Sequence, residues 1–243
     1  MAESFTVIGI TGTIGAGKGT VVERLVEYNF VHYSARTLLN EMIAEQGLPP
    51  GRDSLRVVAN ALRKARGPAA VIELLFAQAQ AVGKDAVIES VRTEGEIEAL
   101  RKTGLPFTLL AVDADQRTRY ERIASRGTST DTVSFEEFCA QEAKEMSSTE
   151  AHEQNLSRCM SLADVTLLNN GSQAQFAQRI DAFASSLRLQ PQSRHPSRSL
   201  AAFALVGGVI LLAAGAWWSS SRRREEEAVE RRAAVAALPT RGS

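Results

Sequence analysis

The feature that most constrains the fold is the glycine-rich stretch Gly12–Thr20, which reads Gly-Thr-Ile-Gly-Ala-Gly-Lys-Gly-Thr. It follows the apolar run Phe5–Ile10 and precedes the amphipathic run Val21–Tyr28. A strand, a glycine-rich loop and a helix in this order are typical of a phosphate-binding loop. The sequence therefore predicts a domain in which this loop joins the first strand to the first helix.

The residue types of the loop suit phosphate binding. Glycines let successive backbone N–H groups curl around phosphate oxygens, and the helix N-terminus adds partial positive charge. Lys18 adds a full charge for the β- and γ-phosphates, but Gly19 stands where a hydroxyl residue usually follows the lysine, and the hydroxyl comes at Thr20. The predicted nucleotide-binding residues are Gly12, Gly15, Ala16, Gly17, Lys18, Gly19 and Thr20.

Composition sets the broad class. The chain has 243 residues, of which 44% are hydrophobic, with 28 basic and 28 acidic side chains and a formal net charge of zero. This length suits one α/β domain with a real core plus a smaller part. Because no basic excess is present, we expect no nucleic-acid partner.

Short apolar runs alternate with longer helical patterns along the first part of the chain. Such alternation predicts a doubly wound α/β domain with a parallel sheet covered by helices on both faces. The five expected strands are Phe5–Ile10, Phe30–Tyr33, Ala86–Glu89, Phe107–Val112 and Val165–Leu168. The expected helices are Gly17–Tyr28, Arg36–Gln46, Ser54–Arg66, Ala69–Val82, Glu94–Thr103, Gln116–Ser125, Phe135–Met146, Glu153–Leu162 and Gln173–Leu189.

The composition changes at residue 190. A polar linker over residues 190–199 precedes Leu200–Trp218, which carries no charged residue, and a charged tail follows over residues 219–243. At 1.5 Å per residue, a helix over Leu200–Trp218 would be roughly 28 Å long, close to the thickness of a hydrocarbon core. The sequence therefore predicts a phosphate-loop domain over residues 1–189 and a single C-terminal transmembrane helix, with the domain facing the cytosol.

The Gly-Lys-Gly-Thr ending of the loop resembles adenylate kinase and its nucleoside-monophosphate kinase relatives. The segment after the second expected strand resembles their acceptor site, in which Ser34 and Arg36 match a small hydroxyl residue and a following arginine. The chain departs there from the Thr-Gly-Asp sequence of that family. The pattern Arg52…Leu62-Arg63…Gly67 resembles deoxynucleoside-monophosphate kinases. The pattern Ala163-Asp164-Val165…Asn169-Asn170-Gly171 resembles the end of dephospho-coenzyme A kinases. The resemblance covers roughly residues 5–189 and implies a P-loop nucleotide-kinase-like family.

The resemblance assigns roles to further residues. Glu89 ends the third expected strand, where an acid can hold magnesium beside the phosphate loop, and we expect Thr20 to assist it. Arg92 follows a few residues later and can clamp a phosphate. Arg63 falls in the acceptor-binding region, while Arg119, Arg122 and Arg126 bracket the start of a lid over the transferring phosphoryl group.

These observations predict an ATP- and magnesium-dependent kinase. Its acceptor is a nucleotide-like small molecule, with a (deoxy)nucleoside monophosphate as the first choice and dephospho-coenzyme A as the alternative. Lys18, Arg92, Arg122 and Arg126 are the expected catalytic residues, and Ser34, Arg36, Arg63 and Arg92 the expected acceptor-binding residues. A different class stays open, namely a membrane-anchored, non-catalytic nucleotide-binding module.

Overall fold

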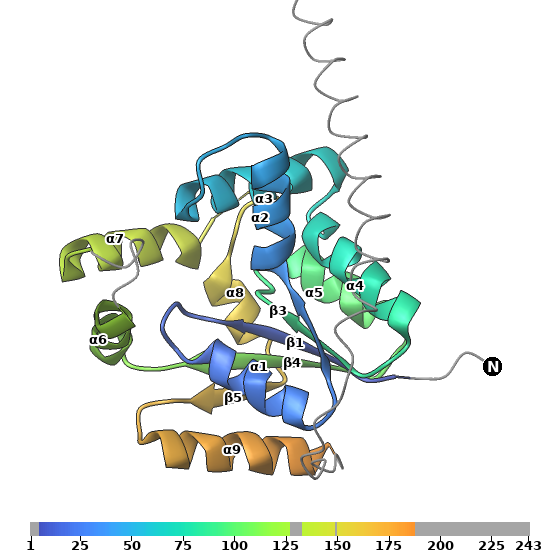
Figure 1. The fold of residues 1–243 in the computed structure, drawn as a ribbon, viewed down its shortest axis with the longest axis vertical. Helices are drawn as coiled ribbons and strands as arrows, with labels where there is room; N and C mark the ends of the chain where they lie inside the picture. Colours follow the sequence, from blue (N-terminus) through green and yellow to red (C-terminus); the bar gives the residue numbers. More distant parts are fainter. Residues whose placement is uncertain (1–4, 127–132, 149, 188–243) are drawn as a thin grey trace, which may run out of the picture. The chain divides into compact units, whose positions relative to one another are not determined.

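The computed structural model describes residues 5–126, 133–148 and 150–187. Within these residues the chain forms five strands and nine helices, with one to three helices between successive strands. Figure 1 shows their arrangement. The strands are β1 (Val7–Gly12), β2 (Val31–Ser34), β3 (Ala86–Glu89), β4 (Phe107–Asp113) and β5 (Val165–Leu168). The helices are α1 (Lys18–Glu27), α2 (Ala35–Glu45), α3 (Arg52–Arg66), α4 (Ala70–Val82), α5 (Glu94–Arg101), α6 (Gln116–Arg126), α7 (Phe135–Met146), α8 (Leu156–Ser161) and α9 (Gln173–Ser186).

The strands form one parallel sheet with the order β2-β3-β1-β4-β5. This confirms the predicted five-stranded, doubly wound α/β fold, and it places the phosphate-loop strand β1 in the centre. Glu89 pairs in register with Ile10 on one side and with Ser34 on the other. Because parallel strands end at the same edge, the residues that follow β1, β2 and β3 come together there.

Helices cover both faces of the sheet. Helices α1 and α9 pack together on one face, over a core that includes Ile8, Val87 and Leu110. Helices α4, α5 and α8 pack against the other face (Figure 1). Because both faces are covered, the strands read as nearly continuous apolar runs rather than alternating ones.

Local capping sets where several helices begin. The side chains of Thr93, Ser134 and Ser172 each accept a hydrogen bond from a backbone N–H three residues later, in capping boxes completed by Glu or Gln. Asn155 caps α8 in a similar way, by accepting from the N–H of Arg158. This cap explains why α8 begins at Leu156 rather than at the predicted Glu153.

The structure does not support the prediction of a membrane-spanning helix. No helix among the described residues is long and apolar enough to cross a bilayer, and Leu200–Trp218 itself lies outside them. The longest described helix, α3, has 15 residues and would span roughly 22 Å, short of a hydrocarbon core of about 30 Å. The predicted membrane localisation, with a domain facing the cytosol, depended on that helix and is withdrawn with it.

Candidate phosphate-transfer site

The glycine-rich loop connects β1 to α1, as predicted, and Lys18 is the first residue of α1. The ammonium of Lys18 folds back over the loop and donates to the carbonyl oxygens of Gly12, at 2.8 Å, and Thr13, at 2.7 Å. Burial, followed by the nearby Arg92 guanidinium, lowers the pKa of Lys18 to about 7. The loop therefore holds a desolvated cation in a cluster of other charges.

The glycines of the loop differ in what they require. Gly12 has φ of 131°, and a Cβ there would lie 2.0 Å from the carbonyl oxygen of Val112 in β4. A Cβ at Gly17 would lie 2.5 Å from the side-chain nitrogen of Asn169. Gly19 has nothing within 4 Å of the equivalent position. The loop is thus pressed against β4 and the end of β5, while Gly19 faces open space.

Substitution of Gly12 by alanine is expected to destabilise the fold by at least about 2 kcal/mol, because the new Cβ meets β4 backbone and the φ is strained for an L residue. Thermal denaturation should show the loss as a lowered Tm. Gly19→Ala is the matched control, and it should leave Tm unchanged or raise it, since helices favour alanine over glycine. Equal Tm values for the two variants would contradict this account of the loop.

Glu89 lies at the carboxyl end of β3, and His32 of β2 lies beside it. The Nε2 of His32 is 3.1 Å from the Oε2 of Glu89. This hydrogen bond, followed by the charges of His32, Lys18 and Arg36, holds the pKa of Glu89 below its ordinary value despite burial. These neighbours therefore favour the charged form of the Glu89 carboxylate.

Both the backbone and the side chain of Arg92 have hydrogen-bond partners. Ser90, two residues earlier, has φ of 74°, so the chain turns sharply after β3. The N–H of Arg92 donates to Glu96 at 2.7 Å. Its Nη1 donates to Glu145 of α7, at 2.7 Å, and to Gln154, at 2.9 Å.

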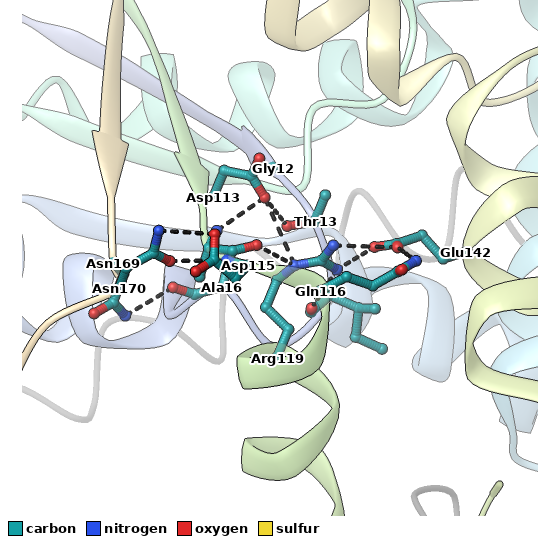
Figure 2. Close-up of polar contacts among 12 residues, drawn as sticks. Gly12, Thr13, Ala16, Asp113, Asp115, Gln116, Arg119, Glu142, Asn169 and Asn170 are labelled. Atoms are coloured by element: carbon teal, nitrogen blue, oxygen red, sulfur yellow. Dashed lines mark hydrogen bonds and ion pairs between the residues drawn. The ribbon is translucent and has the colours of Figure 1, made fainter. Parts of the chain in front are cut away.

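Arg119 connects α6 to the phosphate loop and to α7 (Figure 2). Its Nε donates to the carbonyl of Ala114 at 2.7 Å, and its Nη1 to the carbonyl of Ile14 at 3.3 Å. Its guanidinium also forms a buried ion pair with Glu142 of α7. Alongside, the hydroxyl of Thr13 donates to Asp113 at 2.6 Å. Arg119 is therefore a structural bridge behind the loop.

The other two predicted lid arginines, Arg122 and Arg126, differ in environment. The Nη2 of Arg122 donates to the backbone carbonyl of Asn169 at 2.8 Å, while its Nη1 is buried without a partner among the described residues. Asn169 in turn donates to the carbonyl of Ala16 at 2.8 Å, so it ties Arg122 to the loop. Arg126 is exposed at the end of α6, and the predicted lid segment that follows it lies largely outside the described residues.

The predicted acceptor-binding residues do not all lie at one site. Ser34 caps α2 by accepting from the N–H of Thr37, and Arg36, the second residue of α2, is exposed. Arg63 is buried in α3, where its Nε and Nη2 donate to Glu96 at 3.0 and 2.8 Å. The Nη1 of Arg63 is buried without a partner among the described residues.

The metal prediction rests on two side chains. The side chain of Glu89 is largely buried, and its neighbours favour its charged form. Thr20, two residues after Lys18, is exposed. Within residues 5–126, 133–148 and 150–187, no group of three or more His, Cys, Asp or Glu side chains is placed to hold a metal ion. A metal ion at this site would therefore take most of its ligands from groups other than these side chains.

Several residues of the site were not predicted from the sequence. His32, Asp113, Glu142, Glu145 and Asn169 all contact predicted site residues or the loop. Glu142 and Glu145 are three residues apart on a helix and so share a face, which was an available signal. His32 precedes Ser34 by two residues in a strand, which places both side chains on the same face.

Comparison with known proteins supports a P-loop assignment. Residues 8–153 match the AAA domain family. A UPF0200 protein from Methanoculleus marisnigri is 29% identical over 74% of this chain and 96% of its own length. A UPF0200 protein from Thermococcus sibiricus is 28% identical over 76% and 96%. The crystal structure of TT1252 from Thermus thermophilus has a TM-score of 0.50 and 22% identity over 76% of this chain and 98% of that one, which shows a shared fold.

The match to the AAA domain family confirms the predicted P-loop family. The parallel sheet and the position of the loop between β1 and α1 agree with a P-loop α/β fold. The fold alone leaves the acceptor open, because P-loop domains carry out many different reactions.

Proposed function

Because this chain belongs to the AAA domain family of P-loop proteins, we propose that it is a magnesium- and ATP-dependent kinase with a (deoxy)nucleoside monophosphate as acceptor. One observation carries the proposal. Lys18 follows β1, whereas Glu89 ends β3 and Arg92 lies in the turn after it, so two segments that follow neighbouring strands supply the three residues. The charges of Glu89 and Arg92 both act on the pKa of Lys18, and the charge of Lys18 acts on that of Glu89. We propose that residues 1–189 form the catalytic domain.

The donor nucleotide would bind at the glycine-rich loop. The backbone N–H groups of Gly15, Ala16, Gly17, Lys18 and Gly19 would cradle the phosphates. The ammonium of Lys18 would exchange its two carbonyl partners for β- and γ-phosphate oxygens, which bring charges that carbonyls lack. This exchange would place the positive charge where negative charge develops during transfer.

The carboxylate of Glu89 fits a magnesium ion held mainly by phosphates and water. Mg²⁺ bound to nucleotides takes one or two protein carboxylates and keeps several waters. The charged form of Glu89 is favoured by its neighbours, one of which is Lys18, and the exposed residue Thr20 lies in the first turn of α1. Bound Mg²⁺ would neutralise phosphate charge, while Glu89 would hold and orient it from the protein side.

The acceptor would bind between the end of β2 and Arg92. Ser34 ends β2 beside Glu89 in the sheet, and Arg36 is the second residue of α2, which follows at once. Both would contact a phosphate that approaches Lys18. Arg92 would clamp the acceptor phosphate, and Arg122 with Arg126 would stabilise the transferring group. For Arg63 we propose a structural role instead, because its guanidinium is directed into Glu96.

The test is phosphoryl transfer by the full chain, with ATP, Mg²⁺ and a panel of ribo- and deoxyribonucleoside monophosphates plus dephospho-coenzyme A. We expect transfer to at least one monophosphate, detected as ADP and a nucleoside diphosphate. Transfer to dephospho-coenzyme A alone would replace the proposed acceptor. Nucleotide binding without transfer to any member of the panel would overturn the kinase proposal in favour of a non-catalytic binding module.

Glu89→Gln provides a second check on the magnesium role. The amide keeps the size of the side chain but removes the charge that attracts the ion, so the activity should need a higher Mg²⁺ concentration. Glu98→Gln is a matched control on an exposed helix position, and it should leave the Mg²⁺ requirement unchanged. An unchanged requirement in Glu89→Gln would remove Glu89 from the metal site.

A further inference from the structure

Glu145 of α7 stands among cations that come from three other segments. Its Oε2 accepts from the Nη1 of Arg92 at 2.7 Å. Burial acts to raise the pKa of Glu145, but Arg92, Arg52 and Lys18 outweigh it and hold that pKa below its ordinary value. Arg52 also donates to Gln141, one turn earlier on α7, at 2.6 Å. A protein carboxylate therefore supplies the negative charge at a place where cations converge.

The carboxylate of Glu145 accepts fewer hydrogen bonds than that of Glu96, the other carboxylate that binds Arg92. Glu96 is 0% exposed and accepts from Arg63, from the N–H of Arg92 and from the N–H of Thr93. In contrast, Arg92 is the sole hydrogen-bond donor to Glu145 among the described residues. The Glu145 side chain is 15% exposed and that of Arg92 is 21% exposed. The Arg92–Glu145 pair can thus separate without breaking a wider network.

Arg92 can release Glu145 and still remain in place. Its backbone is fixed from both directions, since its N–H donates to Glu96 and its carbonyl accepts from the N–H of Asn155 at 2.9 Å. Its side chain also keeps Gln154 as a neutral partner at 2.9 Å. A guanidinium forms two parallel hydrogen bonds with a phosphate, whereas Glu145 takes one from Arg92.

We propose that Glu145 is a specificity-determining residue of the acceptor site, because its carboxylate occupies the anion position of Arg92 and yields it to an acceptor phosphate. A phosphate dianion brings more charge than a carboxylate and can displace it, whereas a neutral hydroxyl acceptor cannot. Glu145 would therefore select acceptors that carry a phosphate. This inference rests on the proposed function, since it takes Arg92 as the acceptor clamp.

The experiment measures binding of inorganic phosphate by calorimetry, with the full chain saturated with Mg²⁺ and a non-hydrolysable ATP analogue. Glu145→Gln keeps the size of the side chain but removes the competing charge, so phosphate should bind roughly fivefold more tightly. Glu136→Gln is the matched control, since it removes the same charge from an exposed position of α7, and it should leave the Kd unchanged.

Arg92 provides the internal check. In an Arg92→Gln background, Glu145→Gln should give no tightening, because the competition is for that guanidinium. Glu145→Asp, which retracts the carboxylate by one methylene, should tighten phosphate binding by a smaller factor in the wild-type background. This second variant keeps the test decisive if Glu145→Gln fails to fold.

Two results would overturn the inference. An unchanged Kd in Glu145→Gln would show that the carboxylate does not compete, and a weaker Kd would show that Glu145 positions Arg92 for the ligand. The outcome is separable from that of the proposed function. Tighter phosphate binding by Glu145→Gln without phosphoryl transfer by the wild type would contradict the kinase proposal alone. Phosphoryl transfer by the wild type without tighter phosphate binding by Glu145→Gln would contradict the role of Glu145 alone.

Discussion

Lys18→Ala is expected to lower kcat/KM for phosphoryl transfer by at least about a hundredfold, the loss typical when one electrostatic stabiliser of a transition state is removed. The ammonium of Lys18 folds over the loop and donates to the carbonyls of Gly12 and Thr13. Charge spreads over the equatorial oxygens of the transferring group, and an alanine leaves it without this compensation. Steady-state kinetics with the best acceptor of the panel measure the change.

Lys84→Ala is the matched control, because it removes the same group from an exposed position between α4 and β3. Its kcat/KM should equal that of the wild type. The far-UV circular dichroism of both variants should match the wild type, since Lys18 contacts carbonyls that its own loop provides. Activity that survives in Lys18→Ala would mean that the glycine-rich loop does not bind the donor for transfer.

The sheet and the phosphate loop were predictable because their signals are local. Each strand is a short apolar run bounded by turns, and β3, β5 and α7 have the predicted bounds. The strand β1 continues two residues beyond its predicted end, to Gly12, because these residues pair with Ala111 and Val112 of β4. Such an extension depends on the neighbouring strand, which local sequence does not reveal.

The partners of the arginines were not predictable, because pairing depends on residues far apart in the sequence. Arg63 and Arg92 look alike in a sequence, yet one is 2% exposed and bound to Glu96, while the other is 21% exposed and bound to Glu145. Their spatial difference follows from how α3 and α7 pack. Burial of an arginine therefore has to be seen in the structure before its role can be assigned.

Arg63→Met is expected to destabilise the protein by about 3–5 kcal/mol, because it leaves the buried Glu96 charge without its partner. Glu96 is 0% exposed and also accepts from the backbone N–H groups of Arg92 and Thr93, so it cannot turn out to water without breaking these bonds. For a domain of this size, such a loss lowers Tm by roughly 10 °C or more. Thermal denaturation of the full chain measures it.

Two comparisons make the Arg63 result decisive between a structural and an acceptor-binding role. Arg56→Met, at an exposed position of the same helix with Asp53 at 3.8 Å, should leave Tm nearly unchanged. Adding Glu96→Gln to Arg63→Met should recover part of the stability, because a neutral amide needs no counter-charge. If Arg63 binds the acceptor instead, Arg63→Met would keep its Tm and raise the KM for the acceptor, because Glu96 would then have no need of the guanidinium.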